Sequence, residues 1–368
     1  AGAVCASAHL FSKNSENYFK KLILMSGSIN GLLDVYENTT VDSSTRIAAQ
    51  QMGCFKQRDQ ANHTYIFSCL LNQTIENITK YSDNVTYRIN MPNTLGFNII
   101  LDDTVFFNGT LEEKIQTGNM KYHVDVLFGM PNNGGSFFLP ILKNATQFGC
   151  TNTNSFNYNN DTCKLSENNY TSFWKYIENP LNLGNQSEIV KNIYNSSKDG
   201  IYRQDAINVL TDVSYRCHMV EFARKVNIKT NGYIYGYYFN TSSSNNNWPQ
   251  WMVSTHGDEL DYAFGLPFRY PGNYTQRLEQ EKMLSENVMN MIKNFTVLEG
   301  SSLGWMDFVD KSRKGISINA DFYQDRRISL IDDMETSECR KILKYLPKYF
   351  SLYEPLTTMS TSQFRSTG

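Results

Sequence analysis

The sequence contains no long apolar run, no excess of charge of one sign and no Cys-x-x-Cys pair. Without an apolar run of about 18 residues, no segment has the character of a transmembrane helix. Lys and Arg number 34 against 36 Asp and Glu, and this net charge of −2 argues against nucleic-acid binding. The cysteine spacing makes a zinc or redox motif a weak interpretation. We therefore expect no metal, no cofactor and no nucleic-acid partner.

The chain also lacks an initiator Met and a signal peptide at Ala1, so we expect a processed or truncated piece of a longer protein. Its 368 residues are enough to bury a core. At 40% hydrophobic and 13% aromatic, the composition is too apolar for a disordered chain.

Asn-x-Ser/Thr triplets are abundant. The sequence has 14 of them, where random mixing of this composition would give about six. An Asn-rich proteome is the alternative explanation, but glycosylation agrees with cysteines that pair in an oxidising compartment. We expect a secreted or extracellular-surface glycoprotein, with glycans at Asn38, Asn62, Asn72, Asn77, Asn84, Asn108, Asn144, Asn160, Asn169, Asn185, Asn195, Asn240, Asn273 and Asn294.

Apolar strands alternate with helical segments. Three strands are predicted at Lys21–Met25, 124–130 and 232–239, and residues 1–12 are helical in pattern. This alternation is typical of an α/β domain with a parallel sheet covered on both faces. Three strands are few for such a sheet, so we expect part of it to lie outside this chain. Further helices are predicted at 43–52, 111–117, 207–226 and 276–295.

Three other segments have a distinct composition. Residues 145–200 are rich in Asn, Ser, Thr and Tyr, and we interpret them as a glycosylated surface excursion within a single domain, 1–368. Residues 338–352 predict an amphipathic helix, interrupted at Pro347. The polar residues 360–368 predict a flexible tail.

Five histidines are candidates for a catalytic base. His63 lies in a glycosylation triplet and is expected on an exposed loop, whereas His9 and His218 lie on helical segments and fit packing or surface roles. His123 precedes a strand and has no partner nearby in sequence. His256 follows a strand and a polar loop, which is where α/β enzymes place a base.

The stretch around His256 carries a resemblance. Residues 233–267 read YIYGYYFNTSSSNNNWPQWMVSTHGDELDYAFGLP, and the similarity extends to AGAVCASAHLFS at the start and FGMPNNGGSFFL at 128–139. This pattern resembles the catalytic-histidine region of the cholinesterases, within the type-B carboxylesterase family of α/β-hydrolases. The resemblance spans nearly the whole chain and weakens in 70–100, 145–200 and 296–330. It implies an α/β-hydrolase fold with a mixed, mostly parallel sheet whose N-terminal part is absent from this chain.

The resemblance also implies roles for single residues. His256 matches the general base, and Glu259 matches a buried carboxylate behind the active site. Phe137 and Trp248 match aromatics of a choline-binding gorge, and Phe138 beside them is a further ligand-binding candidate, because such faces attract quaternary ammonium. The alternative for each ring is core packing, and His256 would then be a satisfied loop histidine.

Two parts of the family's triad do not match. The nucleophilic Ser would be the residue before Ala1. Gly134, in NNGGSFF, occupies the triad-acid position, and the neighbouring Asn133 carries no charge. Loss of the acid removes the stabiliser of the imidazolium, which in a related triad lowers turnover about 10⁴-fold. His256 would then be a vestigial base.

The resemblance also pairs four cysteines, Cys54 with Cys69 and Cys217 with Cys339. By position alone, Cys150 and Cys163 pair locally within the surface excursion. Cys5 has no pairing partner left, and we expect it to be a buried free thiol.

The sequence thus favours a secreted, glycosylated cholinesterase-like protein that is catalytically inactive as given and acts by ligand binding or protein–protein contact. The alternative is the C-terminal part of an active choline-ester or carboxylic-ester hydrolase with His256 as base, and a third interpretation is a bare structural scaffold. The ligand would be choline-like or an ester. The expected partners are a second copy, paired through the C-terminal helix and the helix near 207–226, or a complementary N-terminal segment.

Overall fold

A five-stranded sheet forms the centre of the computed structural model, in the order β1-β4-β5-β6-β7. The first four strands are parallel and β7 is antiparallel to β6. The strands are β1 (Lys21–Met25), β4 (Asp125–Pro131), β5 (Ile234–Phe239), β6 (Gly315–Ile318) and β7 (Ser329–Ile331). A parallel pair, β2 (Val35–Tyr36) and β3 (Ile99–Ile100), lies apart from it. The structure describes residues 1–31, 35–36, 38–55, 63–89, 97–100, 105–106, 108–142, 145–150, 163–196, 200–246, 248–298, 303–322 and 328–346.

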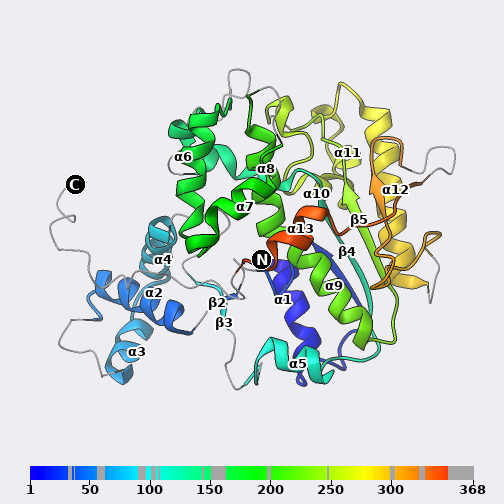
Figure 1. The fold of residues 1–368 in the computed structure, drawn as a ribbon. Coiled ribbons are helices and arrows are strands. Elements are labelled where there is room, and N and C mark those ends of the chain that lie inside the picture. The colour runs from blue at the N-terminus through cyan, green and yellow to red at the C-terminus, as the bar shows by residue number, and fades with distance from the viewer. Residues whose placement is uncertain are drawn as a thin grey trace.

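Helices cover both faces of this sheet, with α1 and α9 on one side and α12 on the other (Figure 1). Alternate residues of one strand enter different cores: Val126 and Phe128 of β4 join the larger cluster, and Leu127 joins the smaller one. Burial of both faces explains the apolar strand sequences. The helices are α1 (Gly2–Ala8), α2 (Asn38–Gln51), α3 (His63–Leu71), α4 (Ile75–Ile89), α5 (Leu111–Thr117), α6 (Glu167–Glu178), α7 (Ser187–Ile193), α8 (Arg203–Thr211), α9 (Cys217–Lys229), α10 (Asp258–Ala263), α11 (Leu266–Arg269), α12 (Leu278–Val297) and α13 (Ser337–Ile342).

The three predicted strands are present, within two residues of their expected starts. Strands β6 and β7 were not predicted, because four and three residues are too short for a periodic signal. The helix expected at 207–226 is longer and is interrupted by a π-turn, η8 (Asp212–Arg216), between α8 and α9. The C-terminal helix ends at Ile342, where 338–352 was predicted; residues 347–352 and the tail at 360–368 lie outside the described part of the chain.

The segment 145–200 contributes to the core. Within it, α6 buries Tyr170, Phe173, Trp174 and Ile177, all in the larger hydrophobic cluster. Its polar composition predicted a surface excursion because the Asn and Ser residues occupy the outer helix faces and hide the apolar stripe.

Three disulfides are formed, and all join the expected pairs: Cys54–Cys69, Cys150–Cys163 and Cys217–Cys339. Cys5 is a free thiol, but the expectation that it is buried is wrong, since it is exposed. Helical geometry explains this, because Val4, Ser7 and Ala8 form the inner face of α1 and Cys5 points to the other side. In the described residues we find no helix long and apolar enough to cross a bilayer.

Candidate functional site

The candidate site lies where parallel strands end. Strand β4 ends at Pro131 and leads into the 3-10 turn η3 (Gly134–Phe137), while β5 ends at Phe239 and leads into the loop that carries His256. Strand β1 ends just before Ser26. Because carboxyl ends of parallel strands meet at one sheet edge, residues far apart in the sequence come together here.

Hydrogen bonds hold the two loops against each other. The backbone N–H of Asn133 donates to the carbonyl of Ser254 at 3.1 Å. The hydroxyl of Ser136 lies 3.1 Å from the Met252 carbonyl and 2.9 Å from the Thr255 hydroxyl. These bonds fix the position of His256, one residue further on.

Aromatic rings surround the His256 imidazole. Tyr215, from η8, stacks on it with 4.9 Å between ring centroids and 10° between planes. Phe137 and Phe138 lie with their ring centroids 6.1 Å and 6.0 Å away. Trp248 meets Phe137 edge-on at 5.4 Å. The site is thus a histidine contacted by three aromatic rings, with Trp248 packed on one of them.

The His256 side chain has an unusual electrostatic setting. Burial lowers the pKa of its imidazole to about 4. Its Nδ1 is buried and meets no hydrogen-bond partner among the described residues. The imidazole is therefore neutral near pH 7, and its Nδ1 lacks the carboxylate that a triad acid would supply.

Two carboxyl groups follow His256 in sequence, and both are engaged elsewhere. Asp258 accepts hydrogen bonds from the Thr255 backbone at 2.9 Å and from Asn246 at 2.6 Å. Glu259 is 3% exposed and accepts a hydrogen bond from the Ser26 hydroxyl at 3.0 Å. Burial raises the pKa of each carboxyl to about 7. Glu259 thus lies buried, as the resemblance implied.

The three candidate ligand-binding rings differ in exposure. Phe138 is 3% exposed and belongs to the larger core cluster, so it offers a ligand almost no surface. Phe137 and Trp248 are both half-buried. If a ligand approaches His256, these two rings are the ones it can meet.

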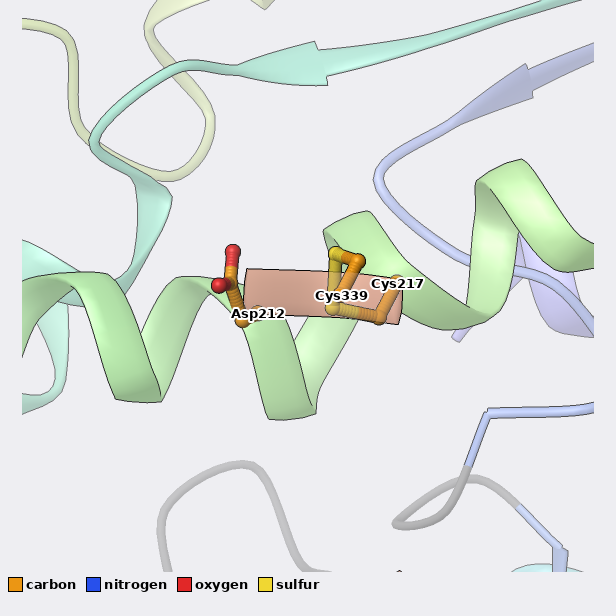
Figure 2. Close-up of side chains that lie close together, drawn as sticks. All are labelled: Asp212, Cys217 and Cys339. Atoms are coloured by element: carbon orange, nitrogen blue, oxygen red, sulfur yellow. A yellow bond between two sulfur atoms is a disulfide. The ribbon is translucent and has the colours of Figure 1, made fainter. Parts of the chain in front are cut away.

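Three side chains lie as close together as the ligands of a metal ion would. The ligand atoms of Asp212, Cys217 and Cys339 lie within 4.8 Å of one another and are buried. Figure 2 shows that the two sulfur atoms are joined as a disulfide, with the Asp212 carboxylate beside them. A disulfide offers no thiolate to a metal, and Asp212 is already paired with Arg216 at 2.6 Å. The residues present do not fit a metal site.

His256 joins Gly134, Phe137, Phe138 and Trp248 in one place. Sequence reasoning missed Tyr215, because its position depends on the π-turn that rotates it toward His256, and such a turn has no sequence pattern. Sequence reasoning also missed Ser26. The Ser-Gly-Ser that follows β1, at the edge of the sheet where that strand ends, is the signal that could have identified it.

Comparison with known proteins gives the family of this chain. The Carboxylesterase family model matches residues 1–333. Similar proteins include the cholinesterase of Mus musculus, 24% identical over 96% of this chain and 55% of the relative. The acetylcholinesterase of Bungarus fasciatus is 26% identical over 80% and 46%, and that of Danio rerio 23% over 96% and 58%.

The mostly parallel sheet, with a histidine on the loop after a strand, is an α/β-hydrolase fold. The chain belongs to the carboxylesterase family and is cholinesterase-like within it. It spans about half the length of the curated relatives that it matches.

Proposed function

We propose that this protein is a secreted, glycosylated cholinesterase-like protein that does not hydrolyse esters through a Ser-His-acid triad. It acts instead by binding a ligand or another protein. The observation that carries the proposal is the surroundings of His256: aromatic rings lie beside the imidazole, and its buried Nδ1 has no acceptor among the described residues.

In a serine-hydrolase triad the base must take a proton from the nucleophile. The imidazolium formed in that step is stabilised by an acid at Nδ1. Gly134 supplies none, and a histidine whose pKa lies near 4 is a weak base at neutral pH. Both effects disfavour the transition state.

Ester hydrolysis by the native full-length protein tests this proposal. The native protein should hydrolyse choline esters and naphthyl esters no faster than the His256→Gln variant does. An organophosphate should label none of its serines. Turnover that disappears in His256→Gln, together with a labelled serine, would instead establish the alternative.

That alternative is an active choline-ester or carboxylic-ester hydrolase with His256 as its base. One observation favours it: Ala1, just before α1, lies near the His256 imidazole, and by the resemblance the residue adjoining Ala1 is the nucleophile's position.

The proposed ligand is a choline-like cation held on the exposed faces of Phe137 and Trp248. Their edge-to-face pair at 5.4 Å offers two π surfaces, each attractive to a quaternary ammonium. Titration with choline should quench Trp fluorescence in the parent protein and not in Trp248→Phe. Trp305, 7% exposed on the other side of the sheet, gives a matched control in Trp305→Phe. No quenching in the parent protein would favour the bare scaffold.

Two partners remain proposals. Among the described strands, β1 pairs only with β4, so its other edge suits a parallel strand from a complementary N-terminal segment. The other partner is a second copy docked through α13 and the α8–α9 region. Light scattering of the native protein distinguishes them, since a homodimer doubles the mass and a complementary segment appears as a second peptide in the intact mass.

A further inference from the structure

Gly134 and Tyr215 face each other across the site. A Cβ atom added to Gly134 would lie 3.5 Å from Cδ2 and 3.6 Å from Cε2 of the Tyr215 ring, which is ordinary van der Waals contact. The same ring stacks on His256 at 4.9 Å. Tyr215 therefore lies both against the imidazole and within van der Waals contact of a Cβ atom at position 134.

The backbone explains how the two residues come so close. Turn η3 packs on the end of α8, and the N–H of Gly135 donates to the Thr211 hydroxyl at 2.9 Å. A Cβ at Gly135 would lie 2.5 Å from the Thr211 nitrogen and 2.6 Å from the Ile207 oxygen, so only glycine allows this approach. The π-turn η8 begins one residue after Thr211 and carries Tyr215. The surroundings hold Tyr215 in place as well, since its exposure is 2%.

We propose that Tyr215 fills the space that a carboxylate at position 134 would need. Gly134 and Tyr215 then form a coupled pair, in which the absence of a side chain at position 134 lets the Tyr215 ring stack on His256 and hold it in position. A glutamate side chain adds two more carbons and two oxygens beyond a Cβ that already contacts the ring. Restoring the acid thus requires a second change at position 215. This inference deepens the proposed function, but its test needs no ester hydrolysis, so the two can fail separately.

The first experiment measures the stacking itself. With histidine ring-labelled protein, the His256 ring protons should be shifted upfield by the ring current of Tyr215. The shift should persist in Tyr215→Phe, which keeps the ring, and be lost in Tyr215→Leu. His218, a second buried histidine outside this ring cluster, serves as an internal control and should not move. An unchanged His256 signal in Tyr215→Leu would overturn the stacked arrangement.

The second experiment is a double-mutant cycle on the melting temperature. Gly134→Ala should change Tm little, because its added Cβ makes only ordinary contact. Gly134→Glu should lower Tm clearly in the parent protein and by less than half as much in a Tyr215→Ala background. Equal losses in both backgrounds would contradict the coupling.

The doubly changed protein has a further readout. A carboxylate introduced at position 134, with space to reach Nδ1, should raise the His256 pKa relative to Tyr215→Ala alone, as read from the same ring protons. No rise would show that position 134 does not face Nδ1 and would also overturn the proposal. Should Gly134→Glu fail to fold by itself, the Tyr215→Phe and Tyr215→Leu spectra still decide the stacking.

Discussion

At the scale of single residues, desolvation controls the charge of two histidines, the buried His218 and the half-buried His256. Desolvation lowers the pKa of His218 to about 4, as it does for His256. For His218 the neighbouring Glu221 opposes that shift, and Lys225 adds to it. Both imidazoles are therefore neutral at pH 7. A neutral ring agrees with a packing role for His218. A neutral His256 forms no ion pair with a carboxylate.

His218 should make the protein less stable in mild acid. Because its folded-state pKa lies below the unfolded value near 6.5, the unfolded chain takes up the proton first. Stability that is present above pH 6.5 is lost as the pH falls toward 4, by up to about 3 kcal/mol for such a shift. Denaturant unfolding of His218→Leu across this range should show a shallower loss than the parent protein. The exposed His63 gives the control, His63→Gln, and an equal slope in His218→Leu would refute the assignment.

At the scale of elements, two segments that look peripheral in the sequence are tied to the core. Helix α6 carries four buried residues in a segment full of Asn and Ser. The C-terminal element α13 is held by the disulfide Cys217–Cys339 to the start of α9, and by ion pairs around Glu335. Neither element should be removable without loss of the fold.

Phe173 tests the role of α6. It is 0% exposed, so Phe173→Ala should leave a cavity and reduce the free energy of unfolding by about 3–5 kcal/mol. Lys175, two residues away and exposed, is the matched control, and Lys175→Ala should stay within about 0.5 kcal/mol. Chemical denaturation measures both. A Phe173→Ala loss as small as the control's would restore the interpretation of α6 as a surface addition.

Glu335 tests the attachment of the C-terminal segment. Its 5%-exposed carboxylate meets Arg224 at 3.0 Å, Arg313 at 3.5 Å and Arg340 at 3.6 Å. Glu335→Gln should lower the free energy of unfolding by about 2 kcal/mol. This is less than the ~3–5 kcal/mol expected for breaking a fully buried ion pair, because the arginines reach solvent. The exposed Asp332, in Asp332→Asn, should cost little. Hydrogen exchange should show faster opening of α13 in Glu335→Gln alone, and equal exchange in the two variants would argue against this role.

At the scale of the whole molecule, surface chemistry decides how the protein behaves in solution. Figure 1 shows α2, α3 and α4 as a group beside the sheet-bearing body. Two of these helices expose large apolar side chains, at Phe67, Leu71, Ile75 and Ile78. The triplets at Asn72 and Asn77 lie among them, and both Asn side chains are exposed. Glycans on these two residues would cover the apolar surface.

If Asn72 and Asn77 carry the glycans we propose, removing them should cause self-association. Enzymatic deglycosylation, or Asn72→Gln with Asn77→Gln, should give larger species in light scattering than the glycosylated protein. Leu71→Lys with Ile75→Lys should return the unglycosylated protein to its original size, because charge replaces the exposed apolar contacts. If deglycosylated protein keeps its size, the α3–α4 surface is not what glycans protect.

The sequence by itself determined the fold class, the positions of β1, β4 and β5, and the place of His256, because buried strands and the motif around His256 leave continuous patterns. The resemblance also assigned Gly134 to the triad-acid position, and this assignment stays a prediction. Only the tertiary structure decided that Tyr215 stacks on His256. The stacking depends on a π-turn that has no sequence pattern and on the close approach of Gly135 to Thr211, which lie far apart in the sequence. The same holds for the buried side of α6 and the exposed side of Cys5, because the partner across a helix is chosen by packing and not by local spacing.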